Sequence, residues 1–274
     1  MQAAPALFHR LVDDAALFPP GNAAMADAVP GHGQFLASAH ADLVGPFLCP
    51  SSRLGELVDE LHHVERLDLG LIVDTGLEDV ERASAAAVAD DRIALAIVEV
   101  PVPTGADLPL ETERAIRGSP AGVRLHVELP RSPGWPQALD VLAAAGQGAK
   151  LRTGGLRAEL FPTGAELGAF ISACAERAVP FKCTAGLHHA VCHTDPDAGW
   201  HHHGFLNILV ATSRALTDGD VDDAVREARP EVLAAEAASI DPTTAVATRA
   251  LFRSYGSCNI DEPIDDLRQL GLIR

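Results

Sequence analysis

One unit recurs along the chain about eight times: a short apolar run rich in β-branched residues, a turn, and a stretch with helical periodicity. Strands that alternate with helices pair in parallel through right-handed crossovers, because the intervening helix has to pack on the sheet that the strands form. Eight such units fit the roughly 250 residues typical of a (β/α)8 barrel. The sequence therefore predicts an α/β fold of the (β/α)8 TIM-barrel type, with a doubly wound open sheet as the alternative.

The expected elements follow from apolar runs bounded by turn residues. Thr163 followed by Glu166 three residues later is typical of a capping box and indicates where one helix begins. Residues 218–253 are predicted to form extra helices before the last strand, and residues 1–274 to form a single domain. We expect strands at residues 11–18, 43–49, 69–74, 93–100, 123–129, 149–153, 180–184 and 255–260, and helices at 53–64, 77–89, 135–145, 164–177 and 204–216.

Charge and composition limit the classes of partner. The formal net charge of −17 argues against a nucleic-acid partner, because phosphates are bound by basic patches. No segment approaches the ~20 apolar residues of a membrane span, and residues 1–20 lack the pattern of a secretion signal. The five cysteines show no C-x-x-C spacing and are expected to be reduced thiols. We expect a cytoplasmic protein that binds a small-molecule substrate and neither nucleic acid nor membrane, with homo-oligomer formation left open.

Lysine occurs at only two positions, Lys150 and Lys182, whereas the chain has nineteen arginines. Each lysine lies near the end of an expected strand, in a similar local sequence. An arginine is in effect always protonated, but a buried lysine can lose its proton and become a base or a nucleophile. This pattern favours amine chemistry.

Strand alternation places several charged side chains in the barrel lumen. Successive residues of a strand point to opposite faces, so the apolar residues 123, 125, 127 and 129 should face the helices and the residues between them the lumen. Burying so many charges costs free energy unless they pair or serve a site. One explanation is a buried ion-pair network, for instance Arg124 with Glu99 or Glu128; the other is an active site at the carboxyl ends of the strands. The lumen face is expected to carry Arg124, His126, Glu128, Lys150, Arg152, Lys182 and Thr184.

The sequence Lys150-x-x-Thr153-Gly154, with Lys182 one strand later, resembles the paired lysines of class I barrel aldolases of the deoxyribose-phosphate aldolase type. In that family the lysine of the K-x-x-T-G strand forms a Schiff base with a carbonyl substrate, and the second lysine lowers the pKa of the first. The resemblance implies that Lys150 is the nucleophile and Lys182 its electrostatic partner. This chain lacks the family's Gly-Gly phosphate loop after the second lysine and a clear match for its catalytic aspartate.

These observations give the expected site. We expect lyase or aldolase chemistry, or a related carbonyl or enol isomerisation, on a small oxygenated and anionic substrate. Planar guanidinium groups suit bidentate contact with carboxylate or phosphate, which assigns Arg124 and Arg152 to substrate binding. The expected proton carriers are His126, Glu128 and Glu99, and further expected substrate contacts are Thr184, Ser257, Asn207 and Asp14.

A metal-dependent lyase, hydrolase or oxygenase is the main alternative. Half of the twelve histidines fall between residues 188 and 203, and histidine with carboxylates suits zinc, iron or manganese. The strand-end carboxylates Asp74, Glu99 and Glu128 also look like the magnesium-holding acids of the enolase superfamily. No cofactor is certain, and the candidate metal ligands are His188, His189 and His203. A second alternative is a non-catalytic binding or scaffold barrel in which the lumen charges form only salt bridges.

Overall fold

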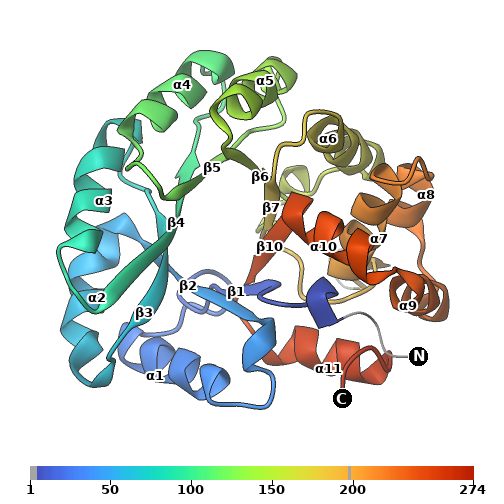
Figure 1. The fold of residues 1–274 in the computed structure, drawn as a ribbon, viewed down its shortest axis with the longest axis horizontal. Coiled ribbons are helices and arrows are strands. Elements are labelled where there is room, and N and C mark those ends of the chain that lie inside the picture. The colour runs from blue at the N-terminus through green and yellow to red at the C-terminus, as the bar shows by residue number, and fades with distance from the viewer. Residues whose placement is uncertain (1–4, 197–198) are drawn as a thin grey trace.

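The computed structural model describes residues 5–196 and 199–274 and shows a closed barrel of parallel strands surrounded by helices (Figure 1). Around the barrel the strands follow the order β1-β10-β7-β6-β5-β4-β3-β2. The (β/α)8 prediction is therefore confirmed, and the open sheet is excluded. The barrel strands are β1 (Val12–Asp14), β2 (Val44–Pro50), β3 (Leu67–Ile72), β4 (Ile93–Pro101), β5 (Arg124–Glu128), β6 (Gly148–Arg152), β7 (Phe181–Thr184) and β10 (Phe252–Ser257).

Helices cover the outside of the barrel (Figure 1). The predicted insertion before the last strand consists of three helices, α8, α9 and α10, that follow α7 along the chain. A two-stranded antiparallel ribbon of β8 (His193–Thr194) and β9 (His201–His202) lies in the segment after β7. The α-helices are α1 (Met25–Leu36), α2 (Leu54–Glu60), α3 (Val80–Val88), α4 (Leu108–Gly118), α5 (Trp135–Ala145), α6 (Gly164–Glu176), α7 (Phe205–Ala215), α8 (Val221–Arg226), α9 (Pro230–Ser239), α10 (Pro242–Leu251) and α11 (Asp261–Gln269). Short 3₁₀ helices are η1 (Pro5–Leu7), η2 (Ala41–Leu43), η3 (Ser51–Arg53), η4 (Leu61–His63), η5 (Leu77–Asp79) and η6 (Ala158–Leu160).

Local sequence signals account for several element boundaries. The capping box at the start of α6 is confirmed: Thr163 Oγ1 accepts the Glu166 N–H at 3.2 Å, and Glu166 Oε2 accepts the Thr163 N–H at 2.7 Å. Helix α4 was not among the predicted helices. Its N-cap is Asp107, whose carboxylate accepts the Leu110 N–H, and a proline follows in the first turn. An aspartate two residues before a proline is the signal that could have predicted this helix.

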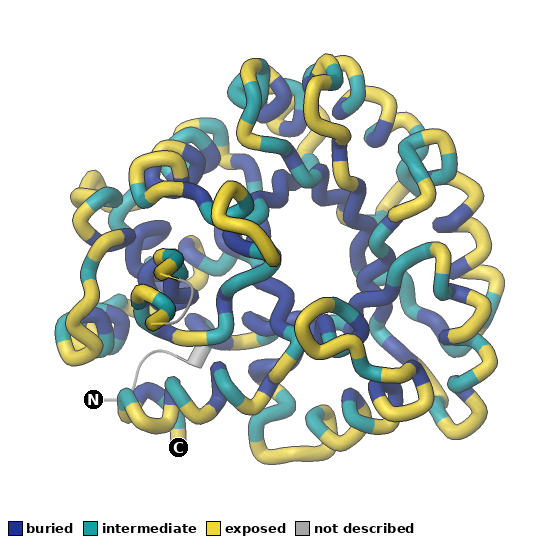
Figure 2. Tube along the Cα trace, turned by 180° about the vertical axis from the view of Figure 1, so that it is seen from behind, coloured by how far each residue is buried: buried dark blue, intermediate teal, exposed yellow. Residues whose placement is uncertain are grey.

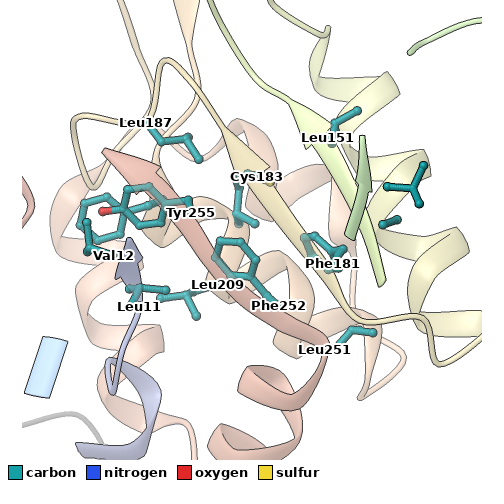
Figure 3. Close-up of a cluster of buried hydrophobic side chains, with 14 of the residues drawn as sticks. Leu11, Val12, Leu151, Phe181, Cys183, Leu187, Leu209, Leu251, Phe252 and Tyr255 are labelled. Atoms are coloured by element: carbon teal, nitrogen blue, oxygen red, sulfur yellow. The ribbon is translucent and has the colours of Figure 1, made fainter. Parts of the chain in front are cut away.

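The outward faces of the strands form the apolar core between barrel and helices. Figure 3 shows Leu151, Phe181, Cys183 and Tyr255 of β6, β7 and β10 within one buried cluster. The Tyr255 ring stacks on Phe205 of α7 with 5.2 Å between centroids. Burying a large apolar side chain stabilises the fold by about 1.5–3 kcal/mol, so this layer holds helices and barrel together. In Figure 2 the strands form a buried ring, and exposed residues lie on the outer sides of the helices.

The inward faces divide the lumen into an apolar part and a charged part. On the apolar side, a side chain at Gly70 of β3 would overlap Leu48 of β2 and press on Ile97 of β4, so these residues meet inside the barrel. Strands β5, β6 and β7 carry the predicted charged residues at the alternating positions. The apolar residues between or beside them are buried against the helices; they are Leu125, Val127, Leu151, Phe181 and Cys183. The predicted alternation of faces is therefore found.

Candidate functional site

Both lysines converge on the carboxylate of Glu99. Lys150 Nζ of β6 lies 2.5 Å from Glu99 Oε2, and Lys182 Nζ of β7 donates to Glu99 Oε1. Glu99 lies on β4, on the other side of β5. The side chains of Lys150, Lys182 and Glu99 are only 4%, 1% and 1% exposed, respectively. We name these three residues, with Asp13 and Glu128, the lumen cluster.

The other two carboxylates of the lumen cluster complete the ion pairs. Glu128 Oε2 lies 3.1 Å from Lys150 Nζ, and Glu128 Oε1 accepts a hydrogen bond of 3.0 Å from Arg152 Nε. Asp13 forms an ion pair with Lys182 and accepts a hydrogen bond of 2.7 Å from the Ser254 hydroxyl. With Arg152 included, three carboxylates face three cations. The lumen cluster and Arg152 together carry no net charge, which is the condition under which buried charges are tolerated.

Strand register sets the height of each group in the barrel. Glu128 is level with Lys150, and Lys150 with Lys182, while Glu99 lies two residues closer to the N-terminal ends of the strands. The long lysine side chains span this difference. Glycine makes room beside the acid on β1, because a side chain at Gly45 would overlap the Asp13 carboxylate.

The carboxylates hold both lysines protonated. Burial by itself would lower the pKa of Lys150, but the charges of Glu99 and Glu128 outweigh it, so the pKa is raised. For Lys182, burial is likewise outweighed by Asp13 and Glu99, and the pKa is again raised. The charge of Lys182 lowers the pKa of Lys150, as the aldolase resemblance requires, but this effect is smaller than that of the acids.

The acids of the cluster respond differently. Burial would raise the pKa of Glu99, but Lys150 and Lys182 outweigh it and leave the pKa well below its usual range. The pKa of Glu128 is also lowered, because Lys150 and Arg152 outweigh its burial. For Asp13 burial dominates over Lys182, and the pKa is raised. Asp13 is therefore the carboxylate of the cluster that takes up a proton most readily.

A cavity of about 1050 Å³ opens at the N-terminal ends of the strands; we call it the N-terminal cavity. Its mouth includes Arg124, the first residue of β5, and Arg253, the second residue of β10. Its inner end reaches the lumen cluster at Asp13 and Lys182, beside His126. Active sites of known (β/α)8 enzymes lie at the opposite, C-terminal face. Sequence reasoning missed this cavity, because no motif marks it.

Arg124 and Arg152 lie toward opposite ends of the barrel. Arg124 is at the N-terminal mouth, whereas Arg152, two residues beyond Lys150, pairs with Glu128 on the C-terminal side. Glu128 lies four positions after Arg124 on β5, which is about 13 Å along the strand. The two arginines are not brought together, so they do not hold the same small anion. The predicted pairing of Arg124 with Glu99 or Glu128 is also absent from the described ion pairs, in which the lysines and Arg152 hold both acids.

Asp13, and not Asp14, joins the lumen cluster. The Asp14 carboxylate lies 3.0 Å from Nδ1 of the buried His32 on α1 and accepts the Ala16 N–H. It lines a smaller cavity of about 380 Å³ beside His188. Asp14 lies outside the lumen cluster because side-chain direction reverses at each step along a strand, and its predicted contact with substrate stays a prediction.

Two of the three remaining predicted substrate contacts, Asn207 and Ser257, have structural partners. The Asn207 side chain accepts the Cys192 N–H and donates to two backbone carbonyls, those of Ala224 and Glu227, so its amide ties the segment after β7 to α8. The Ser257 hydroxyl donates to the Asn259 carbonyl at 2.7 Å. Thr184 is level with Arg152 at the C-terminal end of β7.

The three histidines predicted to bind a metal have separate partners. His188 Nδ1 lies 2.8 Å from Glu262, and His189 Nδ1 lies 3.3 Å from Asp266. The buried His203 contacts the Pro162 carbonyl through Nε2, and burial lowers its pKa to about 4. Within residues 5–196 and 199–274, no three His, Cys, Asp or Glu side chains are grouped so that they could hold a metal ion. The structure thus does not bring these ligands together.

Comparison with known proteins gives no further assignment: no family model and no curated protein sequence matches this chain. Among the described residues, no helix has the length and apolar character needed to cross a membrane. The function therefore has to be argued from the site itself. What the structure establishes is a (β/α)8 barrel with a charged lumen, a fold that commonly carries enzymes.

Proposed function

We propose that this protein is an enzyme that acts on a small oxygenated, anionic substrate by lysine-based carbonyl or enol chemistry of the aldolase or lyase type. The observation that carries the proposal is the convergence of two buried lysines on one carboxylate, Glu99. Taking these charges out of water is expensive, and such arrangements with perturbed pKa values cluster at functional sites.

Lys150 is the proposed nucleophile. In the free protein the acids keep Lys150 protonated, so the proposal requires the bound substrate to shift this balance and let the ammonium proton pass to Glu99, 2.5 Å away. The free amine then attacks a carbonyl carbon and a C–N bond forms. The carbonyl oxygen takes one proton from the amine nitrogen and one back from Glu99, and leaves as water. Glu128, 3.1 Å from the same amine, is placed to remove a proton from the carbon next to the resulting iminium. Lys182 keeps a positive charge nearby, which favours the neutral form of Lys150.

Hydrogen exchange next to a carbonyl tests this reaction class before the substrate is known. The protein is incubated in D₂O with small aldehydes and ketones that carry a carboxylate or phosphate, and proton NMR follows loss of the signal adjacent to the carbonyl. We expect at least one compound to exchange faster with the protein than without it. The rate should fall by at least about 100-fold in Lys150→Arg, because arginine keeps the charge but does not form an imine.

The controls separate the alternatives. Exchange that is undiminished in Lys150→Arg, or the absence of exchange with every compound, would contradict the proposal. Exchange that survives in Lys150→Arg but is abolished by a chelator would favour the metal-dependent alternative. The scaffold alternative is favoured by the charge balance of the lumen cluster with Arg152, and it predicts no acceleration of exchange at all.

A further inference from the structure

The N-terminal cavity is basic although the protein as a whole is acidic. Most cations in its lining already have partners: Arg10 pairs with Asp68 at 2.7 Å, and Lys182 belongs to the lumen cluster. Arg249 donates to backbone carbonyls, including that of Arg253 at 2.5 Å. These contacts hold the cavity wall in place. They leave a smaller set of groups free to bind a ligand.

Arg124 and Arg253 have no such partners. In the part of the chain that the structure describes, neither guanidinium makes a hydrogen bond or an ion pair. Burial, together with the like charge of Arg124, lowers the pKa of Arg253. Arg124 is exposed and Arg253 is half-buried. Two like charges at one mouth repel each other in the free protein, so this arrangement is explained if an anion binds between them.

His126 provides an independent observation deeper in the cavity. The residue is only 2% exposed, it lines the cavity, and neither ring nitrogen has a hydrogen-bond partner among the described residues. Burial, followed by the charge of Lys182, keeps the pKa of His126 well below its usual range, so the ring is neutral. A neutral imidazole offers one N–H donor and one acceptor, and buried polar groups are rarely left without partners.

We propose that the N-terminal cavity is an oxyanion-binding site, in which Arg124 and Arg253 hold the carboxylate or phosphate group of a small molecule and His126 donates a further hydrogen bond. Planar guanidinium groups match both kinds of oxyanion. The rest of the wall contains apolar side chains such as Phe8, Leu43 and Ile97, which suits a ligand with an uncharged body behind its anionic group. The volume of about 1050 Å³ is at the upper end of the usual range for small-molecule sites. This site does not depend on the lysine chemistry, because a scaffold barrel would bind the same anion.

Calorimetric titration with inorganic phosphate and with succinate tests the site. Ionic strength is kept constant with potassium chloride, because salt alone changes charge interactions. We expect at least one of the two anions to bind, and Arg124→Gln and Arg253→Gln each to weaken binding at least about tenfold through loss of a charge-assisted contact. Arg82→Gln, which removes an exposed arginine of α3 that pairs with Asp79 and does not line the cavity, is the matched control and should bind as the unmodified protein does.

A charge-reversal variant protects the test against misfolding. Arg124→Glu places a carboxylate beside Arg253, so it should raise the thermal midpoint while abolishing anion binding. The anion that binds identifies the group recognised, phosphate or carboxylate. Anion binding that is as tight in Arg124→Gln and Arg253→Gln as in the unmodified protein, or that Arg82→Gln weakens to the same extent, would overturn the proposal. So would failure of both anions to bind the unmodified protein.

Discussion

Glu99 is the residue on which the charged half of the lumen depends. Each of its two carboxylate oxygens accepts a hydrogen bond from a different lysine, and its side chain is only 1% exposed. The pKa of Glu99 lies well below its usual range because Lys150 and Lys182 outweigh its burial, so it is ionised at neutral pH. Removing this charge would leave two buried ammonium groups with too few carboxylates.

Glu99→Gln should therefore lower the free energy of unfolding by about 3–5 kcal/mol, the usual cost of breaking a buried ion pair on one side. The measurement is urea unfolding at pH 7, compared with the unmodified protein. Glu56→Gln is the control, because Glu56 pairs with Arg53 at an exposed site and its loss should barely move the midpoint. A cost below about 1 kcal/mol for Glu99→Gln would show that the lysines do not depend on this acid.

At the residue scale, the sequence could predict the face on which a side chain lies but not its height in the barrel. Alternation correctly placed Arg124 and His126 on the lumen side. Register, which only the pairing of β4 with β5 reveals, puts Ile97 level with Arg124 and Glu99 level with His126. Both oxygens of Glu99 are held by Lys150 and Lys182, and the predicted ion pair of Arg124 with Glu99 does not form.

At the scale of elements, β5 and β6 fit together because β6 begins with a glycine. Gly148 is level with His126, and a Cβ at this position would lie 2.5 Å from Cδ2 and Nε2 of the imidazole. The same Cβ would also lie 2.9 Å from the Pro180 carbonyl oxygen, which belongs to the backbone and has little freedom to move. The glycine thus creates the space that the buried imidazole occupies.

Gly148→Ala should destabilise the protein by about 1–3 kcal/mol, the usual cost of overpacking a core, as measured by urea unfolding. In the background His126→Ala the cost should be smaller, since the ring that obstructs the new methyl group is gone. Gly55→Ala is the control: its Cβ would meet nothing within 4 Å, and an alanine within α2 should stabilise the protein by up to about 1 kcal/mol. If Gly148→Ala lowers the free energy of unfolding equally with His126 present and with His126→Ala, the close contact between position 148 and the His126 ring is contradicted.

Element prediction was accurate where the apolar run continues as a strand and wrong where a turn interrupts it. The strand expected at residues 93–100 is observed as Ile93–Pro101. The strand expected at 11–18 ends at Asp14, because the next residues form a turn in which the Phe18 N–H bonds to the Ala15 carbonyl. This turn depends on backbone contacts that hydrophobic periodicity does not report.

At the scale of the whole molecule, the barrel has two different mouths. The C-terminal side carries the ion pair of Arg152 with Glu128, whereas the N-terminal side opens into a cavity that reaches Lys182. The barrel could be predicted from the repeated units, since each contributes a local pattern. The cavity could not, because its lining joins residues from both ends of the chain, from Ala6 to Arg274.

The composition of the chain makes its central claim directly testable. Because Lys150 and Lys182 are the only lysines, an imine that is reduced on the protein can be assigned to one residue by peptide mass spectrometry. The protein is treated with borohydride in the presence of the compound that exchanges fastest in D₂O. We predict a stable adduct on the peptide containing Lys150, absent from Lys150→Arg. An unmodified Lys150, with the compound still undergoing protein-dependent exchange, would contradict a nucleophilic role for this lysine.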